Sequence, residues 1–205
     1  MSPSTSAPQP SSARAVRPGS PRSARLLLAT QQREETQMSA GPDIRERTHQ
    51  WSDPRETAAS AMHSDGLTFI RAMASGEVPP PPIATLLGMS VAEVEPGRVV
   101  FTLEPAEFHF NPIGSVHGGV YATLLDSAAG CAVHTTLPLG ARYTSLDLSV
   151  KFLRALRADS GTVRAEGTVV HAGSRTALTE ARLLDGDGRL CATATSSCLI
   201  IRPDA

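Results

Sequence analysis

One short segment of the sequence combines residue types that could polarise a carbonyl group. It reads Asn-Pro-Ile-Gly-Ser-Val-His-Gly-Gly over residues 111–119 and directly precedes an apolar stretch long enough to form a helix. Because glycine has no side chain, the pair Gly118 and Gly119 lets a ligand approach the backbone closely. The first N–H groups of a helix lack partners within the helix and attract negative charge. The segment is therefore a candidate site for stabilising an oxyanion.

The predicted helix also contains one carboxylate in apolar surroundings. Asp126 follows Leu124 and Leu125 and is soon followed by Ala128 and Ala129. A carboxylate in such a setting destabilises a fold unless it has hydrogen-bond partners or a chemical role. Asp126 is therefore the candidate catalytic carboxylate.

Each of these residues also has a structural interpretation that the sequence leaves open. Glycines before a helix commonly form only a tight turn, and an asparagine before a proline, as at Asn111, is an ordinary turn residue. His117 taken alone is more typical of a structural histidine, and Asp126 could lie on the solvent side of its helix. Periodicity alone indicates an α+β domain with an unusual loop.

Strand patterns on both sides of this segment predict an antiparallel sheet. Glu95-Pro96-Gly97 is a turn tripeptide between two apolar runs, so residues 91–103 should form a hairpin. Residues 143–153 alternate between apolar and polar side chains, as a single strand does. Further strands are predicted at 162–171, 175–184 and 190–201, separated by short glycine-containing turns. Such short connections imply antiparallel neighbours.

Residues 120–135 depart from the strand pattern. They form a wide apolar helical face rich in small side chains, which comprises Val120, Leu124, Leu125, Ala128, Ala129, Ala132 and Val133. A largely apolar helix in an antiparallel sheet protein must be covered by that sheet. The predicted fold class is therefore α+β, with one buried central helix.

The chain before this domain divides into two parts. Residues 1–52 are predicted to be disordered or poorly ordered, because their Ser-, Pro-, Ala- and Arg-rich start cannot bury enough apolar surface. A transit peptide, or an upstream start codon with Met38 as the true start, are further interpretations of this tail. Residues 53–82 predict one helix, ending near Gly76, and a stiff proline link. The compact domain is predicted at residues 83–202.

The composition limits the class of partner. A formal net charge of -1 and a pI near 6.6 favour neither nucleic acid nor an anionic membrane as partner. Cys131, Cys191 and Cys198 lie far apart without a Cys-x-x-Cys motif, which gives no support for a metal site or a disulfide. No apolar stretch reaches the ~20 residues that span a bilayer, and no secretory signal pattern occurs. A cytoplasmic protein with small-molecule partners is expected.

The combined motifs resemble those of one enzyme family. The segment 111–119, the Leu-Leu-Asp that ends at Asp126 and the Tyr-Thr-Ser-Leu-Asp-Leu at 143–148 closely resemble the PaaI-type hotdog-fold acyl-CoA thioesterases, within the 4-hydroxybenzoyl-CoA thioesterase-like superfamily. The resemblance implies a curved antiparallel sheet wrapped around one long central helix. It also implies a homodimer or homotetramer with active sites shared between subunits. The implied reaction is hydrolysis of acyl-CoA to a free acid and coenzyme A, without a cofactor.

The resemblance implies a role for each residue of the motif. Asp126 would be the general base or the nucleophile, and the Gly118 N–H would polarise the thioester carbonyl. His117 would orient the loop or the thioester, and Asn111 would hold water or the carbonyl region. Ser145 would help to place the attacking water.

A second group of residues would bind the substrate or its coenzyme A moiety. This group contains Gly119, Thr144, Lys151, Arg154 and Arg175. Thr144 is also the alternative to its neighbour for placing water, and the three cations lie at strand ends where they could bind phosphates. The interpretation of each cation as an ordinary solvated side chain stays open.

Two other functions compete with this one. A non-catalytic acyl-CoA-binding or regulatory hotdog protein would keep the glycine loop but lack the acid, and the presence of Asp126 argues against it. A hotdog enoyl-CoA hydratase or dehydratase usually relies on a histidine working on carbon, and the aspartate position fits thioester hydrolysis better. The acyl group is left open, and the candidates to line its pocket are Met89, Phe108, Phe110 and Tyr121.

Overall fold

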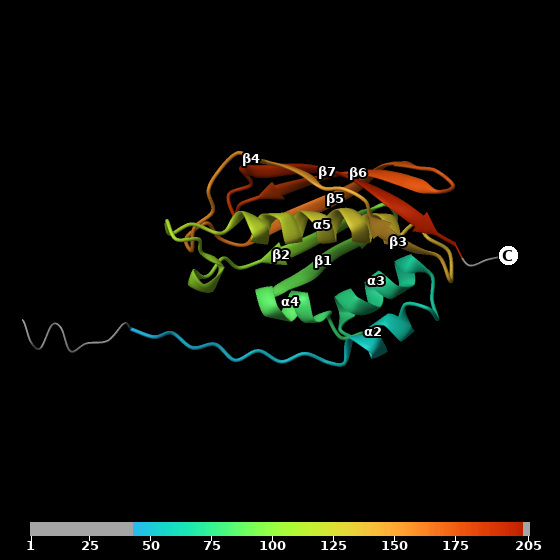
Figure 1. Cartoon of the computed structure of the whole chain (residues 1–205), viewed down its shortest axis with the longest axis horizontal. Coiled ribbons are helices and arrows are strands. Elements are labelled where there is room, and N and C mark those ends of the chain that lie inside the picture. Colours follow the sequence, from blue (N-terminus) through green and yellow to red (C-terminus); the bar gives the residue numbers. More distant parts are fainter. Residues whose placement is uncertain (1–42, 203–205) are drawn as a thin grey trace, which may run out of the picture. The chain divides into compact units, whose positions relative to one another are not determined.

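The computed structural model describes residues 43–202, and Figure 1 gives the labels of its helices and strands. The chain forms two compact units, Met1–Arg47 and Thr48–Ala205. The described part of the first unit, residues 43–47, contains no helix or strand. The disorder predicted for the start of the chain falls mostly on residues 1–42, which lie outside the described residues.

Seven strands form one antiparallel sheet in the second unit. Their bounds are β1 Met89–Glu95, β2 Arg98–Leu103, β3 Arg142–Ser145, β4 Ser149–Phe152, β5 Val163–Ala172, β6 Thr176–Leu184 and β7 Leu190–Ile201. The strand order is β1-β2-β5-β6-β7-β3, and β4 pairs with a second stretch of β7. The hairpin and the three long strands occur where the sequence predicts them, which confirms the antiparallel sheet.

The single strand predicted at residues 143–153 is wrong, because the structure divides it into β3 and β4. Asp147 occupies the break. Its carboxylate accepts a hydrogen bond from the Ser197 N–H at 3.1 Å, and its carbonyl accepts one from the Ser196 hydroxyl at 2.7 Å. These bonds replace regular strand pairing, and Leu146, which the alternation places on the apolar face, is 58% exposed.

The long helix α5 (Gly118–His134) packs against the sheet and contacts β2, β5, β6 and β7 (Figure 1). Its buried residues are Val120, Tyr121, Leu124, Leu125, Ala128, Ala129, Gly130, Ala132 and Val133. The predicted central helix is thus confirmed, and it begins two residues earlier than its apolar pattern. The predicted α+β architecture is confirmed with it.

Helix and sheet meet backbone to backbone at β5. A Cβ atom added to Gly167 would overlap the carbonyl carbon and oxygen of Ala128. Glycine is therefore the residue that permits this separation, and it faces the small side chains of α5. Because Asp126 lies two residues before Ala128, the same contact fixes the depth of the helix turn that contains the carboxylate.

We expect Gly167→Ala to destabilise the fold by about 2–4 kcal/mol, because α5 must move away from β5 to admit the methyl group. Gly173→Ala is the matched control, since an added Cβ there would lie 3.2 Å from the Thr176 carbonyl oxygen and require only a small adjustment. Urea unfolding followed by circular dichroism measures both variants. Equal midpoints would contradict the proposed constraint.

The segment before β1 forms three helices, α2 (Pro54–Ser60), α3 (Gly66–Ser75) and α4 (Pro82–Leu87). The single helix predicted to end near Gly76 is divided because Asp65 caps a second one, its carboxylate accepting from the Thr68 N–H at 3.0 Å. The Gly66 N–H donates to the Leu137 carbonyl at 3.0 Å, and α3 packs on β1 and α5. None of the helices within residues 43–202 is long and apolar enough to cross a membrane.

Candidate active site

The loop that leads into α5 is organised by Asn111. Its side-chain carbonyl accepts hydrogen bonds from the N–H groups of Ile113 at 3.0 Å and Ser115 at 3.2 Å. Its amide nitrogen donates to the Ser115 hydroxyl at 3.0 Å. These bonds form an Asx-type turn, so Asn111 shapes the loop as a turn residue does and also lines a cavity beside the helix N-terminus.

The first turn of α5 has one N–H group available to a ligand. His117 is the N-cap, and its Nδ1 accepts from the Gly119 N–H at 2.9 Å. The Val120 N–H donates to the His117 carbonyl at 2.9 Å. Among the described residues, the Gly118 N–H has no acceptor. Because Nδ1 accepts, the neutral His117 ring has its proton on Nε2. The free Gly118 N–H lies at the positive end of the helix dipole.

A cavity of about 340 Å³, here called the Gly118 cavity, lies beside this N–H group. Tyr121 holds one of its walls in place: the hydroxyl donates to the Arg154 carbonyl at 3.0 Å and accepts from the Leu156 N–H at 2.6 Å. The ring of Phe152 would lie 3.2 Å from a Cβ at Gly118, so β4 closely approaches the glycine. The cavity therefore joins the helix N-terminus to the edge strand.

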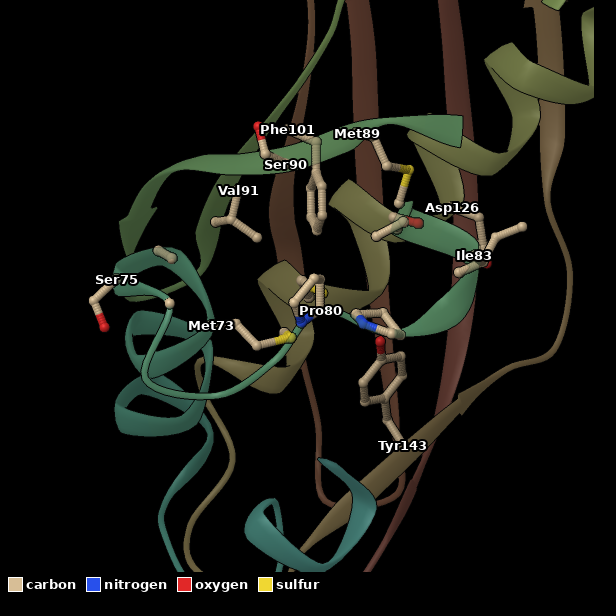
Figure 2. Close-up of a pocket in the computed structure, with 16 residues that line it drawn as sticks. Met73, Ser75, Pro80, Ile83, Met89, Ser90, Val91, Phe101, Asp126 and Tyr143 are labelled. Carbon is tan, nitrogen blue, oxygen red and sulfur yellow. The ribbon is translucent and has the colours of Figure 1, made fainter. Parts of the chain in front are cut away.

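Asp126 lies half-buried in a second cavity of about 500 Å³, here called the Asp126 cavity (Figure 2). The Ser145 hydroxyl of β3 donates to its Oδ1 at 3.0 Å. Within residues 43–202, no other side chain donates a hydrogen bond to this carboxylate. Its second oxygen, Oδ2, is therefore open to the cavity. The neighbouring Thr144 is exposed and lies on the opposite face of β3. Of the two candidates, Ser145 contacts the carboxylate.

The two candidate catalytic groups, the Gly118 N–H and the Asp126 carboxylate, lie apart within one chain. Gly118 and Asp126 are eight residues apart on α5, which corresponds to ~12 Å along the helix axis. They open into different cavities. A single thioester carbonyl cannot contact both groups of the same subunit, because a hydrogen bond spans about 3 Å.

The three predicted phosphate-binding cations lie in different places. Arg154 is exposed and lines the Gly118 cavity. Lys151 on β4 lines a separate groove with Glu180 and Arg182. Arg175 lies beside the other end of β7, where its carbonyl accepts from the Ile200 N–H. The structure therefore brings only Arg154 to the glycine. No group of three or more His, Cys, Asp or Glu side chains within residues 43–202 is arranged to hold a metal ion.

Two of the four predicted pocket residues line a cavity. Met89 lines the Asp126 cavity and Tyr121 lines the Gly118 cavity, whereas Phe108 is half exposed and Phe110 packs against the core. The cavity residues that the sequence did not reveal come from α3, α4 and their connection, including Met73, Pro80 and Ile83. Periodicity gave no signal for them, since their position depends on how α3 packs against β1.

Two polar side chains, Cys131 and Tyr143, also line the Asp126 cavity. The Cys131 thiol and the Tyr143 hydroxyl lie close enough for each to affect the pKa of the other. Burial raises the pKa of Cys131 to about 12, and burial also raises the pKa of Tyr143 well above its usual range. Both groups are therefore neutral at physiological pH.

We expect the Cys131 thiol to resist alkylation in the native protein. With a pKa of about 12, only about 0.01% of the thiol is ionised at pH 8, and the thiolate is the reactive form. Iodoacetamide labelling mapped by mass spectrometry should be at least ~100-fold slower in the folded than in the urea-unfolded chain. Because the folded-state pKa is raised, stability should fall as the pH rises from about 9 to about 12. Native labelling at the unfolded rate would contradict this environment.

An antiparallel sheet packed around one long helix, with a glycine N–H and a carboxylate on that helix, defines the hotdog-fold class of enzymes. Residues 113–192 match the family model described as the thioesterase superfamily. A solved structure of a phenylacetic acid degradation-related protein from Ralstonia eutropha is 31% identical, with a TM-score of 0.58, over 63% of this chain and 98% of that one. The chain therefore belongs to the thioesterase superfamily, and it is a thioester hydrolase by class.

Two curated relatives extend this comparison. A protein of Halobacterium salinarum, provisionally named an esterase, is 35% identical over 103 residues, which are 48% of this chain and 66% of that relative. The 1,4-dihydroxy-2-naphthoyl-CoA hydrolase of Listeria monocytogenes is 28% identical over 104 residues, or 51% of this chain and 83% of that enzyme. The chain thus spans about two thirds of the first relative and most of the second.

Proposed function

We propose that the protein hydrolyses acyl-CoA thioesters in an active site formed by two copies of the chain. The observation that supports this most directly is the separation of the free Gly118 N–H from Asp126. Each group suits one half of the reaction, and their ~12 Å spacing prevents one chain from supplying both. A site completed by a second copy satisfies both requirements.

The reaction uses groups that the chain already has. The Gly118 N–H of one copy donates to the thioester oxygen, where negative charge develops as the carbonyl carbon is attacked. Asp126 of the other copy either removes a proton from the attacking water or attacks the carbon itself. The bond between carbon and sulfur then breaks, and the coenzyme A thiolate leaves with the electron pair and is protonated. If water was the nucleophile, the acid is formed in this step; if Asp126 was the nucleophile, water then hydrolyses the acyl-Asp126 anhydride and regenerates the carboxylate. This route requires no metal or other cofactor.

The open edge of the sheet offers a place for the second copy. Asp126 contacts β3 through Ser145, and Gly118 contacts β4 through Phe152, so both halves of the site lie beside this edge. Antiparallel pairing of the edge with its own copy, centred near the break at Asp147, would place β3 of one copy opposite β4 of the other. Asp126 would then approach the partner's Gly118.

Two properties of this edge favour such pairing. An edge strand has unpaired backbone N–H and C=O groups that can bind another strand. The same strand region exposes Leu146, Phe152 and Leu153, each by more than half. Exposed apolar side chains beside an open edge are typical of a protein interface. A homodimer, alone or within a homotetramer, is therefore part of the proposal.

Coenzyme A is proposed as the thiol for two reasons. The hydrolase of Listeria monocytogenes is named for a CoA thioester, and Arg154 lines the Gly118 cavity, where it could pair with a phosphate. The cytoplasm, where acyl-CoA is available, is the proposed location. Lys151 and Arg175 are kept as candidates for contacts made across the assembled dimer.

We expect Asp126→Asn to lower kcat/KM for acyl-CoA hydrolysis by about a hundredfold or more, because an amide cannot act as base or nucleophile. The asparagine keeps an oxygen that accepts from Ser145, so the fold should be retained. Asp159→Asn, at an exposed loop position, is the matched control and should leave the rate within about twofold. Release of free thiol from a panel of acyl-CoAs measures all three proteins. Equal rates would refute the catalytic role of Asp126.

Mixing two inactive variants tests the shared site. Gly118→Pro removes the N–H at the first helical position, where proline fits, and the preceding His117 has a compatible extended backbone (φ -64, ψ 139). When Gly118→Pro and Asp126→Asn subunits are unfolded together and refolded, half of the dimers are mixed and contain one intact site each. Activity should return to about one quarter of the wild-type value. If no activity returns while the mixed dimer forms, each site lies within a single chain.

A further inference from the structure

We propose that residues 73–84, which comprise the end of α3, its connection to α4 and the start of α4, form the end wall of the acyl pocket and limit the substrate to apolar acyl chains of medium length. This inference rests on the proposed function, since it assigns the acyl group to the cavity beside Asp126. It concerns a segment that precedes the sheet and contains none of the motif residues.

The cavity extends from the carboxylate toward this segment. Asp126 and Met89 lie at one end of it in Figure 2, and Met73 and Val91 lie at the other, with Phe101 between them. Along α5 the lining passes from Asp126 to Cys131, a distance of ~7.5 Å along the helix axis. An acyl group whose carbonyl carbon is beside Asp126 can therefore extend along the helix to Met73.

Two of the hydroxyl groups on the cavity wall have partners in the protein. The Ser75 hydroxyl donates to the Ala72 carbonyl at 3.1 Å and points away from the cavity in Figure 2. The Ser90 hydroxyl pairs with that of Thr102 at 3.2 Å. The Ser127 hydroxyl, next to the carboxylate on α5, also lines the cavity and has no hydrogen-bond partner among the described residues. A polar acyl group would find few free partners, whereas an apolar chain breaks no hydrogen bond.

The volume of the Asp126 cavity limits the length of the acyl chain that it can hold. A water-sized group takes up ~30 Å³ in a liquid, so a cavity of about 500 Å³ has room for up to roughly 16 methylene-sized groups. Chains of about 8 to 12 carbons would fill roughly half to three quarters of this space. Longer chains would collide with Met73 and the prolines behind it.

The wall is held firmly. A Cβ on Gly66 would overlap the carbonyl of His134, so α3 begins in direct contact with the end of α5. The Val78 N–H donates to the Ala72 carbonyl at 3.0 Å, which folds the connection back onto α3. Prolines 79–82 have fixed φ angles. The wall is therefore expected to give a sharp upper limit of chain length rather than a gradual one.

The test is a chain-length profile of kcat/KM for saturated acyl-CoAs of 4 to 16 carbons, with phenylacetyl-CoA added. For the wild type we expect a rise of about fourfold per methylene, a maximum near 8 to 12 carbons and a fall beyond it. Met73→Trp should shift the maximum by at least two carbons toward shorter chains. Met73→Ala should shift it toward longer chains. Met62→Trp, at an exposed position outside the cavity, should leave the profile unchanged.

The outcomes separate this inference from the proposed function. Asp126-dependent hydrolysis with a profile that neither Met73 variant shifts would overturn the end wall and leave the hydrolase standing. A preference of more than about tenfold for phenylacetyl-CoA over the best alkyl chain would overturn the apolar-chain assignment. If the wild type hydrolyses no acyl-CoA, the proposed function fails, and calorimetric binding of free fatty acids of 4 to 14 carbons tests the pocket by itself. If the preferred fatty-acid length shifts in the Met73 variants as expected for hydrolysis, the result supports the proposed end wall. If no fatty acid binds, the proposal of an acyl pocket with this end wall is overturned.

Discussion

The contact on which the rest of this structure depends is the backbone-to-backbone approach of α5 to β5. Gly167 has no side chain, and it faces Ala128 and the other small residues of the helix. Because the helix lies so close to the sheet, its opposite side remains free to face α3 and α4. The residues on that side include Asp126 and Cys131, which line the larger cavity. A single close contact thereby positions a carboxylate beside a space large enough for a ligand.

The same helix is the reason for proposing a site formed by two copies. A helix N-terminus is the natural position for an anion-stabilising N–H, and a cavity wall halfway along the helix is the natural position for a carboxylate. The rigid helix cannot bring these positions together. Each of them instead lies against one half of the broken edge strand, through Phe152 and Ser145 respectively. The break at Asp147 thus marks the symmetric centre of the edge that we propose for pairing.

The sequence was most informative where local rules decide the structure. The glycine motif, the apolar helix and the long strands each depend on a few neighbouring residues, and all of them occur where expected. The family resemblance gave Ser145 a role in placing water, and in the structure its hydroxyl donates a hydrogen bond to Asp126. Local periodicity failed where one polar side chain changes the path of the chain. Asp147 breaks a strand that alternates well, and Asp65 begins a new helix inside an apparently continuous one.

Features that depend on contacts between residues far apart in the chain could not be predicted from the sequence. The role of Met73 and Pro80 as cavity walls follows from the packing of α3 on β1 and α5. The use of Asn111 as the organiser of a turn agrees with the simpler interpretation of that residue, although it also lines a cavity. The assignment of Arg154 rather than Lys151 to the glycine cavity required the path of the chain beyond β4.

The helices before β1 form no part of the hydrogen-bonded sheet, although they wall the larger cavity. Substitutions at the cavity-lining positions of this stretch, such as Met73 and Ile83, can therefore accumulate with little effect on the hydrogen bonds of the strands, whereas the buried Phe69 and Ile70 must be kept for the core. In such an architecture, substrate range and catalytic machinery are encoded in separate parts of the gene. A lineage can diversify its substrates by altering one contiguous block of codons while selection preserves the remainder.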